Sequence, residues 1–206
     1  MDLSAGQRRG LDIFEQVAAL TLFTWMVIRL LPGAHESGGL LSVSVLLISE
    51  GVVVALLLFR RPTQNISMNV EDWLFAAAGT FLPLMVEKGG ATTTGLLGPL
   101  LMLIGLITHV GAKFSLFRSF GLVAANRGVK IGGLYAYVRH PMYAGYMLTH
   151  VGFLLSAPSL WNLAIYAAVW TLLIARIRAE ERILGEDADY RKYARRVKHR
   201  IIPGVY

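Results

Sequence analysis

Long apolar segments, separated by short polar stretches, make up most of this chain. Six can be delimited, at residues 11–31, 40–59, 73–86, 96–117, 142–156 and 160–177. A helix needs about 20 apolar residues to cross the hydrocarbon core of a bilayer, and only helices or closed barrels satisfy their backbone hydrogen bonds there. Continuous apolar runs favour helices. The sequence therefore predicts an all-α integral membrane protein.

The last two segments are separated only by residues 157–159, whose sequence Ala-Pro-Ser predicts a tight turn. Because the fifth segment is short for a spanning helix, we interpret the pair as a transmembrane helical hairpin. Residues 176–199 are charged but keep apolar residues at helical intervals, which predicts a cytoplasmic amphipathic tail helix that continues the sixth segment and is weakened at Gly185. The tail helix could lie on the membrane surface or cover a cofactor pocket. Overall, four spanning helices in residues 1–117 precede a connector, the hairpin and the tail helix in residues 118–206.

The composition supports a membrane protein and excludes several chemistries. Hydrophobic residues make up 55% of the 206 residues, with a mean hydropathy of +0.54, above the values of soluble domains. The absence of cysteine excludes disulfides, thiol nucleophiles and thiolate metal sites. The formal charge of +7 is explained by basic loops that face the cytoplasm and anionic membrane lipids, so no nucleic acid partner is expected.

Basic residues orient the predicted bundle. With the N-terminus inside, the cytoplasmic side carries Arg8, Arg9, Arg60, Arg61, Arg118, Arg127, Lys130, Arg139 and the basic tail. The outer side carries Lys88 in a loop and Arg29 near a helix end, so the positive-inside rule is satisfied. Both termini are therefore predicted to be cytoplasmic in a multi-pass protein. The short Gly/Thr-rich outer loop, residues 89–95, is typical of a compact protein of a prokaryotic inner membrane.

Two polar stretches on this predicted cytoplasmic side carry the chemistry. The first is Gly133-Leu-Tyr-Ala-Tyr-Val-Arg-His-Pro-Met-Tyr-Ala-Gly145. The second begins at Arg176 and continues through Glu180-Glu181 to a Tyr-x-x-Tyr pair, Tyr190 and Tyr193. If the two intervening segments form a hairpin, the stretches meet at the inner edge of the membrane. That arrangement is suited to an enzyme that joins a water-soluble reagent to a lipid-phase substrate.

These motifs resemble the isoprenylcysteine carboxyl methyltransferase family, which is related to the phospholipid methyltransferases. The resemblance covers about residues 105–206 and implies S-adenosyl-L-methionine as the methyl donor. It further implies that the cofactor is held by Arg127, Gly128, Val129, Lys130, Tyr135, Arg139, His140, Pro141, Met142 and Glu180. Arg176 and Glu181 would face the acceptor, a lipophilic small molecule or prenylated substrate, and His140 would be the nearest base.

The residue chemistry agrees with these implied roles. A carboxylate such as Glu180 can accept hydrogen bonds from the ammonium or ribose hydroxyls of the methyl donor. Arg139 or Lys130 can pair with the carboxylate of the methyl donor. Tyrosine rings can pack on adenine or attract a sulfonium by cation–π contact. A carboxylate acceptor needs no general base, whereas a phenol would need one. Pro141 at the first helical position would fix the entry of the fifth segment.

Several polar residues have competing interpretations. Arg176 and Glu180 are spaced i, i+4, so they could form an intrahelical ion pair instead of a site. Glu50 could line a substrate cavity or bridge two helices, because an unpartnered carboxylate inside a membrane is costly. His109 and Lys113 could be cavity walls, although Lys113 could snorkel to the surface. His150 is interpreted as a satisfied interhelical histidine, and no metal site is expected because no compact ligand motif is present.

Two alternative functions remain open from the sequence. The C-terminal half also resembles membrane sterol reductases, which use NADPH. A non-enzymatic membrane scaffold or carrier is the third hypothesis. The sequence does not identify the methyl acceptor, the choice among O-, N- and S-methylation, or the oligomeric state, although a carboxylate oxygen is the acceptor that the resemblance favours.

Overall fold

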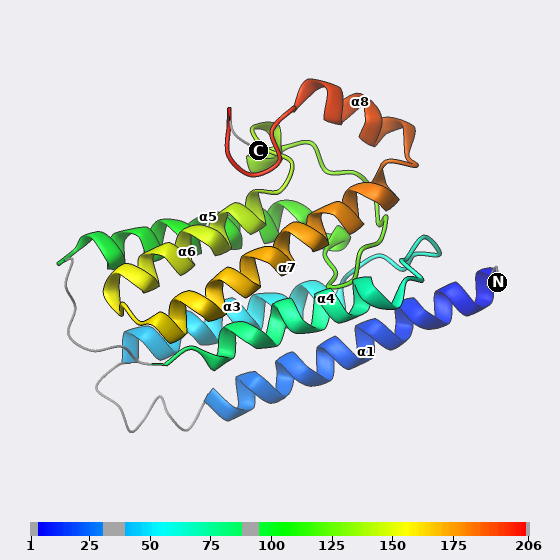
Figure 1. The fold of residues 1–206 in the computed structure, drawn as a ribbon. Helices are drawn as coiled ribbons and strands as arrows, with labels where there is room; N and C mark the ends of the chain where they lie inside the picture. Colours follow the sequence, from blue (N-terminus) through cyan, green and yellow to red (C-terminus); the bar gives the residue numbers. More distant parts are fainter. Residues whose placement is uncertain (1–3, 31–39, 88–94, 205–206) are drawn as a thin grey trace.

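The computed structural model describes residues 4–30, 40–87 and 95–204, with the side chains of 29, 30 and 40–48 excepted (Figure 1). All its regular elements are helices: α1 (Ala5–Leu30), α3 (Leu40–Leu58), α4 (Val70–Phe81), η1 (Leu82–Met85), α5 (Leu97–Leu116), η2 (Phe117–Ser119), η3 (Gly133–Ala136), α6 (Pro141–Ser156), α7 (Leu160–Leu184) and α8 (Ala188–Arg196). Within the described ranges no β-strand is present, as an all-α prediction requires. Lys88, the Arg29 side chain and residues 89–94 lie outside the described part.

Among the residues that the structure describes, three helices are long and apolar enough to cross a membrane, namely Ala5–Ile28, Leu97–Ser119 and Leu160–Leu184. Their outward faces are apolar, as in the exposed side chains of Phe14 and Ile107. The third predicted segment, residues 73–86, corresponds to α4 of 12 residues and to the 3-10 helix η1 that follows it and contains Pro83. Proline removes a backbone donor and cannot continue an α-helix without disturbing it. The predicted total number of spans is not tested by these helices.

The long helices lie side by side, and the polar segments of interest gather at one end of the bundle (Figure 1). That end holds the start of α1, the loop 59–69, the connector 120–140 and the tail after α7. The turn 157–159 between α6 and α7 lies at the opposite end. The fold therefore brings together the two polar stretches that the sequence separates, as predicted from the hairpin.

The tail differs from the predicted continuous helix. α7 does continue through polar residues, but it ends at Leu184 with Gly185 as its C-cap. Asp187 then caps a separate helix, α8, by accepting hydrogen bonds from the backbone N–H groups of Asp189 and Tyr190. Asp is a favoured N-cap because its carboxylate satisfies backbone donors that have no helical partner. The break allows α8 to turn away from the direction of α7.

α6 packs most closely along α5, through glycines that let the two backbones approach. A Cβ atom at Gly145 would lie 2.5 Å from His109 N and 2.7 Å from Gly105 O. At Gly152 it would lie 2.6 Å from Gly98 O. Small residues are used in this way where membrane helices pack closely. The contact fixes the register of α5 against the start of α6 and thus places both next to the polar end.

We expect Gly145→Ala to lower the thermal stability of the detergent-solubilised protein. The added methyl group would overlap the backbone of α5, and overpacking typically costs about 1–3 kcal/mol. Gly10→Ala is the matched control, because nothing lies within 4 Å of its Cβ position on α1. That control should keep or raise the unfolding temperature, since alanine favours a helix more than glycine does. Equal unfolding temperatures for the two variants would contradict the close α5–α6 contact.

Four buried charged side chains join α1 to two loops at the polar end. Asp12 and Glu15 of α1 pair with Arg60, which follows α3, and with Arg127 of the connector. The Asp12–Arg127 and Glu15–Arg127 distances are 2.6 and 3.1 Å. Glu15 also accepts the backbone N–H of Leu122 at 2.7 Å. Charges removed from water are stabilised only when paired and hydrogen-bonded, so these contacts hold the connector against α1.

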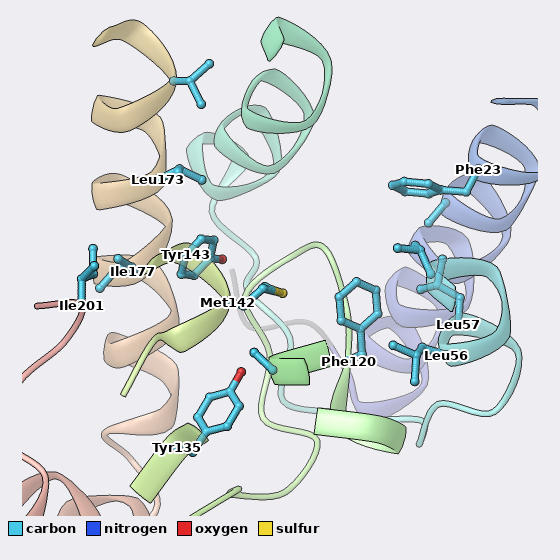
Figure 2. Close-up of a cluster of buried hydrophobic side chains, with 14 of the residues drawn as sticks. Phe23, Leu56, Leu57, Phe120, Tyr135, Met142, Tyr143, Leu173, Ile177 and Ile201 are labelled. Atoms are coloured by element: carbon cyan, nitrogen blue, oxygen red, sulfur yellow. The ribbon is translucent and has the colours of Figure 1, made fainter. Parts of the chain in front are cut away.

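The connector is held by backbone pairing and apolar packing as well. The backbone of residues 65–67 forms hydrogen bonds with the backbone of residues 124–126, and Ile66 and Ala125 form an isolated antiparallel β-bridge. In the core, Met142 and Tyr143 lie between the α7 side chains Leu173 and Ile177 and the connector's Phe120 (Figure 2). The connector is therefore an irregular but supported loop rather than a free linker.

Candidate functional site

A pocket opens where the connector, the start of α6, the end of α7 and α8 meet. Its wall is formed by Leu116, Ser119, Gly121, Val123, Ala125, Arg127, Gly128, Val129, Lys130, Tyr135, Arg139, His140, Met142, Tyr143, Glu180, Leu184, Tyr190 and Tyr193. The backbone of Gly128 has φ +101°, a conformation that favours glycine and lets the wall turn there. Both polar stretches therefore contribute to one pocket.

His140 lies between the two adjacent glutamates of α7. Its Nδ1 is 3.6 Å from Glu180 and its Nε2 is 3.3 Å from Glu181. A neutral imidazole has only one N–H, whereas an imidazolium can donate to both carboxylates. Burial by itself would lower the pKa of His140, but the hydrogen bonds and charges of Glu180 and Glu181 outweigh it and raise that pKa. The Tyr143 hydroxyl also donates to Glu180.

Glu181 links the motif to α8 and to the tail. It accepts hydrogen bonds from Arg139 Nε at 2.8 Å, Arg200 Nε at 2.7 Å and the Tyr190 hydroxyl at 3.4 Å. Arg139 Nη1 donates to the carbonyls of Val197 and Lys198 at 3.1 and 3.2 Å. These contacts use Glu181 to position the motif and the tail. They do not turn its carboxylate towards an acceptor, so the implied acceptor role of Glu181 stays a prediction.

Besides Tyr143, three buried tyrosines form the aromatic part of the wall, namely Tyr135, Tyr190 and Tyr193. The Tyr193 hydroxyl donates to Tyr135 O at 2.7 Å, and the Tyr190 and Tyr193 rings meet edge to face with centroids 5.8 Å apart. Burial raises the pKa of Tyr193 to about 12 and raises that of Tyr190 as well. Both groups are therefore protonated at neutral pH, and they present ring surfaces and hydroxyl donors rather than phenolates.

Arg176 lies one helical turn from Glu180, further into the bundle, and does not line the pocket. Its Nη2 donates to Leu122 O at 2.9 Å, and its guanidinium carbon lies 5.5 Å from the centroid of the Tyr143 ring. Its Nε is buried without a hydrogen-bond partner among the described residues. The intrahelical ion pair with Glu180 is not formed, since the ion pairs of the described residues do not include Arg176. The guanidinium is thus held beside the pocket, and its Nε–H is free to donate a hydrogen bond.

All the predicted cofactor residues except Pro141 line the pocket, and Pro141 is buried at the first position of α6. The charged end of Arg127 points to Asp12 and Glu15, so its contribution to the wall is structural. Sequence reasoning gave no role to Tyr143, although it lies in the quoted motif, and it missed Asp12 and Glu15. The sequence signal that could have identified Asp12 and Glu15 is the presence of two carboxylates at the polar end of an otherwise apolar helix.

The other polar residues that the sequence analysis discussed do not line the pocket. His150 accepts a hydrogen bond from Trp170 Nε1 at 3.2 Å and stacks on Tyr166, which confirms it as a satisfied interhelical histidine. Lys113 is only 3% exposed and does not snorkel to the surface. Glu50 is partly buried on α3. In the part of the chain that the structure covers, no three His, Cys, Asp or Glu side chains are grouped to hold a metal ion.

Comparisons with known proteins agree with the motifs. Residues 93–187 match the family model of the phospholipid methyltransferases. The predicted resemblance is confirmed. The fold is similar to a solved structure of the eukaryotic intramembrane Ras methyltransferase, isoprenylcysteine carboxyl methyltransferase, with a TM-score of 0.53 and 20% sequence identity. The similarity covers 79% of this chain and 65% of that chain, so this chain spans less than two thirds of its length. A sequence comparison with curated proteins gave no match.

The charged state of His140 predicts a pH dependence of stability. Its folded-state pKa is raised above the ordinary value of 6.5, so the stabilisation by Glu180 and Glu181 is complete at lower pH and is lost as the pH rises through the raised pKa. We expect the unfolding temperature of the native protein to exceed that of His140→Gln most at about pH 6, and the difference to shrink towards pH 9. A difference that is constant or grows with pH would contradict a buried imidazolium.

Proposed function

We propose that this protein transfers a methyl group from S-adenosyl-L-methionine to a carboxylate or another nucleophilic group of a lipophilic acceptor in the membrane. The observation that carries the proposal is the pocket itself. It joins the two motif stretches at one end of an apolar helical bundle, and all of its lining residues except Tyr190 and Tyr193 lie within residues 93–187, the region that matches the phospholipid methyltransferases. Under this proposal the pocket and both termini face the cytoplasm.

The pocket residues fit the methyl donor by their chemistry. S-Adenosylmethionine supplies an electrophilic methyl group on a sulfonium, and it also carries an ammonium, a carboxylate, a ribose and adenine. Glu180 is the acidic side chain available for an ammonium or hydroxyls, and Lys130 is a partly exposed cation for a carboxylate. Tyr135, Tyr190 and Tyr193 offer aromatic surface. His140 contacts Glu180, and Glu181 holds α8 and the tail next to the pocket.

Arg176 is the residue that would bind the acceptor. Its guanidinium lies between Tyr143 and Leu122 O, on the membrane side of Glu180, and its Nε has no partner among the described residues. An anionic or polar oxygen of an acceptor would satisfy that donor. Positioning and exclusion of water are the main requirements for an in-line methyl transfer, and correct alignment can contribute about 7–11 kcal/mol. No protein nucleophile is needed.

Donor binding and acceptor turnover should respond to different substitutions. We expect Glu180→Gln to weaken S-adenosylmethionine binding by about 10- to 100-fold, because a hydrogen bond to a charged group contributes roughly 1.5–3 kcal/mol. Arg176→Met should lower methyl transfer to extracted membrane lipids while leaving donor affinity near the native value. Donor affinity is measured by calorimetry in detergent, and transfer by mass identification of lipids labelled from a methyl-labelled donor.

Two exposed residues of the same helical region provide matched controls. Glu186→Gln and Arg178→Met remove the same charges outside the pocket, and both should keep donor affinity and turnover. Binding of NADPH instead of S-adenosylmethionine would favour a reductase and overturn the proposal. Binding of neither would favour a scaffold or carrier. If Arg176→Met abolished donor binding as strongly as Glu180→Gln, the proposed division between donor and acceptor residues would be wrong.

A further inference from the structure

A second polar cluster lies on the membrane side of the pocket, between α5 and α6. It consists of His109 and Lys113 of α5 and Tyr146 of α6, and we refer to it as the α5 polar cluster. His109 and Lys113 are 5% and 3% exposed. The ring of Tyr146 lies 4.8 Å from the ring of His109 and 5.5 Å from Lys113 Nζ, measured to centroids. The buried ammonium of Lys113 and the buried imidazole of His109 therefore both lie close to the Tyr146 ring.

The hydrogen-bonding and charge requirements of this cluster are only partly met by the protein. None of the ion pairs formed by the described residues includes Lys113. Glu50 of α3 interacts with Lys113 electrostatically, but the two do not form an ion pair. His109 Nδ1 is buried and lacks a hydrogen-bond partner among the described residues. Burying a cation away from water is costly unless an anion or several acceptors compensate it.

The cluster adjoins the site described above. The Tyr146 ring is 6.4 Å from the ring of Tyr143, which lines the pocket and donates to Glu180. The Nε of Arg176 also lacks a hydrogen-bond partner among the described residues. The guanidinium carbon of Arg176 lies 5.5 Å from the centroid of the Tyr143 ring. Leu116, one turn beyond Lys113 on α5, lines the pocket as well. Two buried cationic side chains and two unpartnered nitrogens thus border the Tyr143–Tyr146 pair on its membrane side.

We propose that Lys113, supported by His109 and Tyr146, determines acceptor specificity by binding an anionic oxygen of the lipid headgroup. This inference rests on the proposed function, because it assigns the cluster to the acceptor of that reaction. An anionic oxygen compensates the buried ammonium and can accept further hydrogen bonds, whereas a neutral headgroup leaves the charge uncompensated. A cationic headgroup is disfavoured, since Lys113 and Arg176 would repel it. The shared chemistry is that of a carboxylate or a phosphate on an apolar chain.

The experiment measures the binding of three probes that share one apolar chain: oleate, oleyl phosphate and oleyl alcohol. Binding is followed by calorimetry with the full-length protein in a neutral detergent. Lys113→Met removes the charge and keeps an unbranched side chain one atom shorter, and Lys113→Arg retains the charge. Lys192→Met is the matched control, because Lys192 is exposed on α8 and forms an ion pair with the exposed Asp189. S-Adenosylmethionine binding is measured on every variant.

We expect Lys113→Met to weaken binding of an anionic probe by about 10- to 100-fold, the effect of losing a hydrogen bond to a charged group. Oleyl alcohol and S-adenosylmethionine affinities should stay at the native values, and Lys113→Arg should restore most of the anion binding. The stronger of oleate and oleyl phosphate identifies the headgroup class. Equal binding of the anionic probes to the native protein, Lys113→Met and Lys192→Met would overturn the inference. If anion binding depends on Lys113 but the native protein does not bind S-adenosylmethionine, the proposed function fails while the anion site stands.

Discussion

Two adjacent carboxylates near the end of α7 hold together segments that are far apart in the sequence. Glu180 contacts His140 and Tyr143 at the start of α6, while Glu181 contacts His140, Arg139, Tyr190 and Arg200. Successive residues on a helix point in different directions, so one carboxylate can face the pocket while the next faces the tail. Because both are partly withdrawn from water, each is stabilised by several donors rather than by one. The pair therefore links α7 to the motif, to α8 and to the tail.

The opposite wall depends on a second set of buried charges. Asp12 and Glu15 bind Arg60 and Arg127, and through them the first helix supports the connector that lines the pocket. The N-terminal helices are therefore more than a membrane anchor, although the family match begins only at residue 93. A pocket built between two charged scaffolds can keep its polar side chains oriented before a ligand binds, which reduces the ordering cost of binding.

Much of this arrangement was predictable because it follows from local sequence patterns. Apolar runs predicted the long helices, Pro141 predicted the start of α6, and the hairpin turn brought Arg139, His140 and Glu180 to one end. A weakening at Gly185 was predicted, but the division into two separate helices was not, since the apolar spacing continues through it while the Gly185 and Asp187 caps act locally. The α1 charge cluster was also missed, because its pairs join residues 45 to 115 positions apart. Such long-range pairing leaves no periodic signal in one sequence.

The central claim is that residues 127–143 and 180–193 hold one S-adenosylmethionine molecule between them. Ultraviolet cross-linking of methyl-labelled S-adenosylmethionine to the detergent-solubilised protein, followed by peptide mass spectrometry, tests it most directly. We expect label in peptides from both stretches, at the aromatic side chains Tyr135, Tyr190 or Tyr193, and we expect unlabelled donor to compete with it. Label confined to one stretch, label elsewhere in the chain, or the absence of competed label would contradict it.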